Sequence, residues 1–210
     1  MSYWSKKLYV PETGAWIILR TADVDARVSY LQILNLSLGD APRVAVGVTT
    51  ADDAAISDPT GLAGTEVGTA GTTKYEYTVT AVKADGRETN GAAKIAYTNG
   101  PNALDANNYH SLAWTAVTGA AKYRVYCRKN DSEIFMAEVL ANEYINNGGM
   151  GIANRWPWVN MTGISALLAW TTLAPGVGLD VLPRPIQLPA GDIIKLYTTG
   201  PITAFACGEV

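Results

Sequence analysis

The chain has 210 residues, of which 48% are hydrophobic and 17% are charged. This composition excludes intrinsic disorder of the chain as a whole, because disordered chains contain few apolar residues and carry a strong net charge. The formal net charge is −3, from 16 basic and 19 acidic residues. We expect no nucleic acid as a partner, because binding to phosphates needs a basic surface.

Strands are expected along the first fifty residues. Residues 13–21, 26–37 and 43–50 alternate apolar and polar side chains, which is the pattern of strands with one buried face. Residues 24–38 are the best helix candidate of the chain. Their alternating β-branched and aromatic residues nevertheless favour a strand.

The middle of the chain continues this pattern in five short runs. They are residues 74–86, 91–100, 111–117, 121–130 and 133–140. Tyr75, Tyr77 and Val79 share one face of the first run, which ends at Asp85-Gly86, a dipeptide typical of hairpin turns. Short alternating strands separated by turn residues predict an antiparallel β-sandwich.

The last sixty residues also indicate strands, at 164–173, 178–200 and 202–210. Three prolines restrict residues 182–188 to a sheet edge or an extended loop, because proline cannot donate to a central ladder. The longest charge-free stretch, 162–179, contains glycines, a proline and threonines. It predicts sheet and turn, so we expect no membrane span. We also expect no targeting segment, because residues 1–14 lack a continuous apolar core and an Ala-x-Ala cleavage pattern.

Two shifts in composition mark boundaries between domains. Residues 52–73 are rich in glycine and threonine, and residues 142–154 are rich in asparagine and glycine, as loops and linkers are. We therefore expect one β-domain built from residues 1–56 and 150–210, with a second β-domain, residues 57–149, inserted into it. Loop tips tolerate such insertions.

The middle segment resembles the fibronectin type III or immunoglobulin-like modules of tailed-bacteriophage virion proteins. The resemblance rests on residues 75–89, 111–117 and 123–126, with the Trp114 segment following the Tyr75 segment. In ordinary fibronectin type III modules the strand that bears the tryptophan comes before the Tyr-x-Tyr strand, so the order here is permuted. The flanking segments resemble small β-sandwich proteins of phage head and tail genes, through residues 188–192 and the alternating strand that follows.

These resemblances imply an all-β fold, in which a jelly-roll-like sandwich contains an inserted fibronectin type III or Ig-like sandwich. They imply a non-enzymatic component of a virion that is assembled in the host cytoplasm, as capsid decoration, neck or collar, or tail or baseplate. The split sandwich would dock on other virion proteins and on copies of itself, and the insert would project. The alternative is a host-surface adhesin or a carbohydrate-binding module, with a surface glycan as its partner.

The candidate interface residues are aromatic residues and one arginine. Trp156 and Trp158 flank a proline and follow Arg155, and Trp4 lies near the N-terminus. Tryptophan and arginine are enriched at interaction hot spots, and a tryptophan ring can also stack on a sugar. Packing in the seam between the two domains is the alternative for the Arg155–Trp158 segment.

We expect no catalytic residue, no cofactor and no metal site. His110 is the only histidine, no nucleophile motif accompanies it, and we expect it on a surface loop. Asp52, Asp53, Asp58 and Glu66 are carboxylates without the spacing of a calcium loop, which favours a solvated linker. Both cysteines are expected to be reduced, with one of them, Cys127, facing a core.

Overall fold

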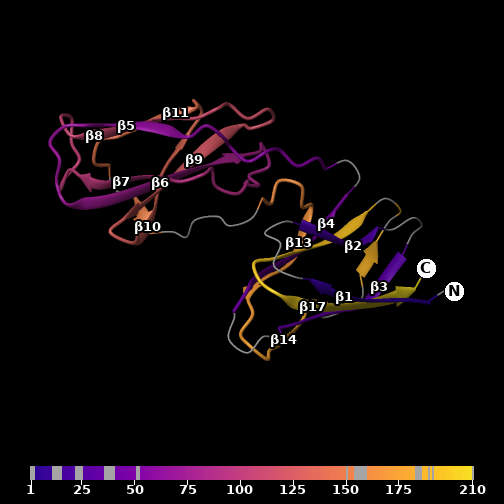
Figure 1. Cartoon of the computed structure of the whole chain (residues 1–210). Coiled ribbons are helices and arrows are strands. Elements are labelled where there is room, and N and C mark those ends of the chain that lie inside the picture. The colour runs from indigo at the N-terminus through magenta and orange to yellow at the C-terminus, as the bar shows by residue number, and fades with distance from the viewer. Residues whose placement is uncertain are drawn as a thin grey trace. The chain divides into compact units, whose positions relative to one another are not determined.

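The structure is a computed structural model that describes residues 3–10, 16–21, 26–35, 41–50, 53–149, 151–153, 160–182, 186–188, 190 and 192–209. Every regular element within these ranges is a β-strand, and all the strand pairs are antiparallel (Figure 1). The all-β fold expected from the alternating sequence is therefore confirmed. A search of the described residues found no helix of the length and apolar character that crossing a membrane requires.

The chain divides into two compact units. Unit 1 comprises Met1–Ala54 and Gly163–Val210, and unit 2 comprises Ala55–Thr162. The insert expected at residues 57–149 lies within unit 2, which extends further at its C-terminal end. The reason is local pairing: Ile152 lies opposite Phe135, and the backbone N–H of Met161 donates to the carbonyl of Glu88. These bonds attach the residues after 149 to unit 2.

Unit 1 contains two sheets. Sheet A has the order β1 (Tyr3–Val10), β17 (Ile202–Glu209), β3 (Ala26–Leu34), β14 (Gly178–Asp180), and β15 (Ile186–Leu188) also pairs with β3. Sheet B has the order β13 (Ala166–Thr172), β4 (Arg43–Thr49), β16 (Ile193–Thr198), β2 (Trp16–Thr21). One apolar core takes side chains from both sheets, among them Leu31, Val46, Leu196 and Ala204, so unit 1 is built as a sandwich.

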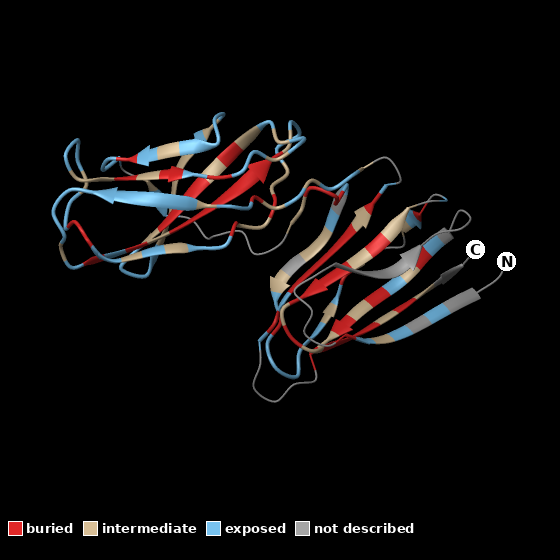
Figure 2. Cartoon of the chain, turned by 45° about the horizontal axis from the view of Figure 1, so that its top comes forward, coloured by how far each residue is buried: buried red, intermediate tan, exposed pale blue. Residues whose placement is uncertain are grey.

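Unit 2 also contains two sheets. Sheet C has the order β11 (Glu143–Asn146), β8 (Tyr109–Ala113), β5 (Ala63–Val67). Sheet D has the order β12 (Ile152–Ala153), β10 (Ser132–Val139), β9 (Lys122–Lys129), β6 (Thr73–Val82), β7 (Ile95–Gly100). The core again joins both sheets, with Tyr77 and Val125 from sheet D against Leu112 from sheet C. Figure 2 shows the buried residues along the facing strands of each unit.

The faces predicted for two strands of unit 2 are confirmed. Tyr75, Tyr77 and Val79 on β6 are at most 2% exposed, and Val125 and Cys127 on β9 are buried equally well. Trp114 follows β8 and packs edge-on against the ring of Tyr123 at 5.4 Å. Rings of this size bury large apolar areas and dominate the stability of small cores.

Unit 2 is inserted between two neighbouring strands of unit 1. The chain leaves unit 1 after β4 and returns before β13, and these strands pair with Val48 opposite Ala166. Beyond the last pair, the hydroxyl of Thr49 donates to the carbonyl of Gly163 at 2.6 Å, and the N–H of Thr50 donates to the Ser165 hydroxyl at 2.9 Å. The two ends of unit 1 are therefore fixed side by side.

The two ends of unit 2 are joined in the same way. The N–H of Ile56 donates to the Thr162 hydroxyl at 2.9 Å, and the Asn160 side chain donates to the carbonyl of Ile56 at 2.8 Å. The Asn160 amide also reaches the carboxylate of Asp58 at 2.8 Å. Each unit thus closes its own ends with its own hydrogen bonds.

Candidate functional site

Of the four candidate interface residues named from the sequence, the described part of the chain includes only Trp4. Trp4 lies in β1, opposite Gly208 of β17. Arg155, Trp156 and Trp158 lie outside the described residues. Their assignment to an interface therefore stays a prediction, and we searched the described residues for a binding surface.

The outer face of sheet A is such a surface, and we call it the β17 face. It consists of Ser5, Lys7, Tyr9, Tyr30, Gln32, Leu34, Thr203, Phe205 and Cys207. The register places Lys7 and Gln32 on either side of Phe205, and Tyr9 and Leu34 on either side of Thr203. The alternate residues of the same strands, such as Ile33 and Ala204, point into the core.

Aromatic rings on the β17 face are open to solvent. Tyr9 is 65% exposed and Tyr30 is 40% exposed. The ammonium of Lys7 lies 5.2 Å from the centre of the Phe205 ring, a cation–π distance. A shallow hollow of about 260 Å³ between these residues is lined by Tyr30, Phe205 and Cys207. Exposed rings beside a hollow are typical of protein contact surfaces.

Sequence reasoning could find this face only in part. The flanking segments contain more apolar residues than so short a pair of segments needs, which indicates a partner. Tyr9 is one of these residues, and it is exposed on the β17 face. Phe205 and Tyr30 do not stand out, because each is one apolar residue within an apolar strand. Parity identifies Phe205, which lies between the core residues Ala204 and Ala206. It does not identify Tyr30, which has the parity of the core residue Val28 and is turned outward by a register shift between the two.

The position expected for His110 is wrong. It lies in β8 rather than in a surface loop, and it is fully buried. Its Nδ1 is 2.6 Å from the hydroxyl of Tyr77, and its Nε2 is 3.1 Å from a carboxylate oxygen of Glu66. The ring of Tyr97 stacks on it at 4.3 Å. Three other strands thus supply the contacts of this one side chain.

The hydrogen bonds around His110 match a neutral ring. The side chain of Asn146 donates to the Tyr77 hydroxyl at 2.8 Å. That hydroxyl can then donate its own proton to Nδ1 of His110, and the Nε2–H of His110 donates to Glu66. Burial lowers the pKa of His110, and Glu66 opposes that shift only in part. Burial also raises the pKa of Tyr77 well above its ordinary value. Both ring nitrogens are engaged, so this cluster stabilises the core and offers no free base.

The carboxylates of residues 52–66 do not form one site. Among those described, Asp53 accepts from the Ser165 hydroxyl at 2.9 Å, Asp58 binds Asn160, and Glu66 binds His110. Within the described part of the chain, no three His, Cys, Asp or Glu residues are grouped as metal ligands would be. Cys127 and Cys207 are free cysteines, and burial raises the pKa of Cys127 to about 12, which keeps its thiol protonated.

Comparison with models of protein families, with curated proteins and with solved structures found no match for this chain. Its function is therefore inferred from its residues and their contacts. The feature of unit 1 best suited to binding is the β17 face, an aromatic sheet face with a hollow beside Phe205.

Proposed function

We propose that the chain is a non-enzymatic structural component of a tailed-phage virion. Unit 1 docks on other virion proteins and on copies of itself, and unit 2 is a module that unit 1 carries. The observation that supports docking most directly is the exposure of Tyr9 and Tyr30 on the β17 face. Tyrosine rings at the centre of an interface supply much of its binding energy.

The strand neighbours in unit 2 support its proposed relation to fibronectin type III and Ig-like modules. Such sandwiches place strands A, B and E in one sheet and strands C, F and G in the other. If β6 corresponds to strand F and β9 to strand C, the pairing β9–β6–β7 has the order C–F–G. The pairing β5–β8–β11 then has the order A–B–E. The permuted order along the chain leaves these neighbours unchanged.

The insertion point supports the division of labour between the units. Because Thr49 and Gly163 are hydrogen-bonded neighbours, a module of any size can be inserted there without separating β4 from β13. A docking domain that carries an exchangeable module needs this geometry.

The experiment is reconstitution on particles. Phage particles assembled without the chain are mixed with the purified protein, and the bound fraction is measured by sedimentation. The chain should bind in many equal copies, and a Tyr9→Ser/Tyr30→Ser double variant should bind at least about tenfold more weakly. Leu140→Ser is the matched control, because Leu140 is 82% exposed but lies in unit 2.

Two outcomes would refute the proposal. The first is absence of the chain from purified virions of the phage that encodes it, measured by mass spectrometry. The second is full binding by the double tyrosine variant together with loss of binding by Leu140→Ser, which would assign docking to unit 2. Binding to a glycan array that depends on Tyr9 and Tyr30 would instead support the adhesin or carbohydrate-binding alternative.

A further inference from the structure

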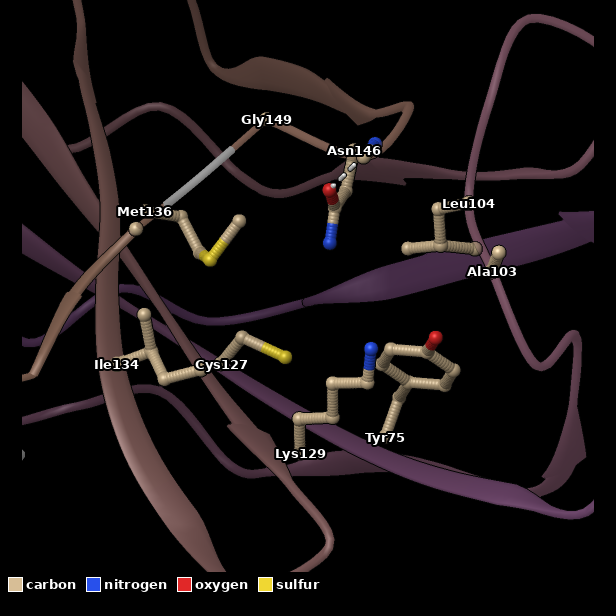
Figure 3. A pocket seen from close by; sticks show the side chains of 11 residues that line it. Tyr75, Ala103, Leu104, Cys127, Lys129, Ile134, Met136, Asn146 and Gly149 are labelled. Carbon is tan, nitrogen blue, oxygen red and sulfur yellow. Dashed lines mark hydrogen bonds between the residues drawn. The ribbon is translucent and has the colours of Figure 1, made fainter.

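Unit 2 contains a cavity of about 420 Å³ beside sheet D (Figure 3). Tyr75 on β6 and Cys127 on β9 line one side of it, and Met136 on β10 lines another. Leu104 enters from the segment between β7 and β8, and Asn146 lies at the end of β11. The volume is within the range of sites that hold small organic molecules.

Most of the cavity wall is apolar. Leu104, Ile134 and Met136 contribute hydrocarbon and a thioether, and Tyr75 contributes the side of its ring. The Cys127 side chain points into the space in Figure 3, and its thiol is protonated because burial raises its pKa. A neutral thiol packs as a small apolar group. The body of a ligand in this cavity must therefore be hydrocarbon.

The polar groups at the cavity are already engaged, with one exception. Asn146 is 2% exposed, donates to Tyr77 and accepts from the N–H of Gly148 at 3.3 Å. The hydroxyl of Tyr75 donates to the carbonyl of Pro101 at 3.0 Å. These bonds hold the wall in place and leave those groups little capacity to bind a ligand.

The exception is Lys129, whose ammonium lies 5.7 Å from the centre of the Tyr75 ring. Its basic neighbours on sheet D are paired with carboxylates: Lys122 with Glu138 at 2.7 Å, and Arg128 with Glu133 at 2.7 Å. Among the described residues, no carboxylate lies within ion-pair distance of Lys129. An unpaired cation at an apolar cavity is complementary to a negative charge.

We propose that this cavity binds a small amphipathic carboxylate, with its hydrocarbon body between Leu104 and Met136 and its carboxylate on the ammonium of Lys129. The geometry favours an anion over a cation or a neutral analogue of the same length. The site lies wholly within unit 2 and does not depend on the proposed docking through unit 1.

The probe is octanoate, compared with octylamine and octanol as the cationic and neutral molecules of the same chain length. Methionine methyl groups labelled with ¹³C report binding in the whole protein, because the chain has only four methionines and Met136 lines the cavity. Octanoate and octylamine are titrated to ~10 mM, above the roughly millimolar Kd expected of so small a ligand. Octanol is titrated to its solubility limit. The Met136 signal is identified from its loss in Met136→Leu.

The expected result is a saturable shift of the Met136 signal with octanoate, at an affinity about fivefold higher than that of octylamine. Lys129→Gln should weaken the binding of octanoate about fivefold and leave the binding of octanol unchanged. Lys122→Gln is the matched control on the same strand and should change nothing. Ala103→Trp should abolish the shift, because Ala103 lines the cavity and an indole at this position would occupy the space of the ligand. Ala103 is exposed, so the core does not have to accommodate the larger side chain.

The proposal is wrong if octanoate gives no saturable shift of Met136, or if octylamine binds as tightly as octanoate. It is also wrong if a folded Ala103→Trp variant binds octanoate as the unmodified chain does. If Ala103→Trp fails to fold, Lys129→Gln decides: equal octanoate affinity in Lys129→Gln and Lys122→Gln overturns the proposal. None of these outcomes bears on whether unit 1 docks on a particle.

Discussion

The hydroxyl of Tyr77 joins two buried polar side chains, and its removal by Tyr77→Phe gives a sharp test of the core of unit 2. The hydroxyl lies 2.6 Å from Nδ1 of His110 and accepts from Asn146 at 2.8 Å. His110 is 0% exposed, so water cannot replace the lost partner of its Nδ1. Asn146 lines the cavity described above, where water can take over its bond. One buried group left without a hydrogen bond costs about 1–3 kcal/mol, and we expect unit 2 to lose that much unfolding free energy.

Tyr75→Phe is the matched control, two residues away on the same strand. Its hydroxyl donates to the carbonyl of Pro101 at 3.0 Å, so the expected loss is about 1 kcal/mol. Amide hydrogen exchange of β6 and β9 measures the free energy of unit 2, with the amides of β3 and β17 as an internal reference in unit 1. A loss in Tyr77→Phe no larger than that in Tyr75→Phe would refute the bridging role of the hydroxyl.

Three further predictions concern pH, a turn and the insertion. His110 is the only histidine, and its lowered pKa means that the unfolded state binds a proton more readily. The stability of unit 2 should therefore fall as pH falls below about 6.5, by at most ~1.4 kcal/mol per pH unit, and urea titrations of His110→Gln should lose this dependence. Asn130 and Asp131 form the turn between β9 and β10 with positive φ angles of 45° and 69°. Because glycine adopts a positive φ without strain, Asp131→Gly should raise the unfolding free energy of unit 2 by about 0.5–1 kcal/mol, measured as a higher thermal midpoint. A lower midpoint would contradict this. Replacement of residues 55–162 by a short glycine-containing turn should leave unit 1 folded, because β4 and β13 remain paired; a coil spectrum by circular dichroism would show that unit 1 needs unit 2.

The alternation of residue types was sufficient to predict which face of β6 enters the core, as Tyr75, Tyr77 and Val79 show. It did not predict that Thr78 and Thr80, on the opposite face of β6, are buried too. β5 could not be predicted in the same way. Its residues Ala63–Val67 are all exposed, so they show no apolar period, and β5 is held by backbone pairing with β8. The segment therefore looks like a linker in the sequence.

The environment of His110 was equally invisible in the sequence. Its partners Tyr77 and Glu66 are 33 and 44 residues away along the chain. A polar residue can be buried where distant strands supply its hydrogen bonds, and local composition carries no information about them. The β17 face has the same character: the exposure of Tyr30 follows from a register shift in its pairing with β17, which the residue types do not reveal.

The insertion has a consequence for the order of folding during synthesis. All the described strand partners of β1, β2, β3 and β4 belong to β13–β17, which the ribosome makes last. Unit 2 is complete before any of these partners emerges, and its joined ends at Ile56 and Thr162 bring the two halves of unit 1 together.

Thr49 and Gly163 are 114 residues apart. Because of the entropy that is lost, closing so long a chain costs about 2–3 kcal/mol more free energy than closing a loop of a few residues. A folded unit 2 removes most of that cost, so unit 2 acts as an internal nucleus for unit 1, and slow folding of unit 2 would leave the first four strands exposed to aggregation.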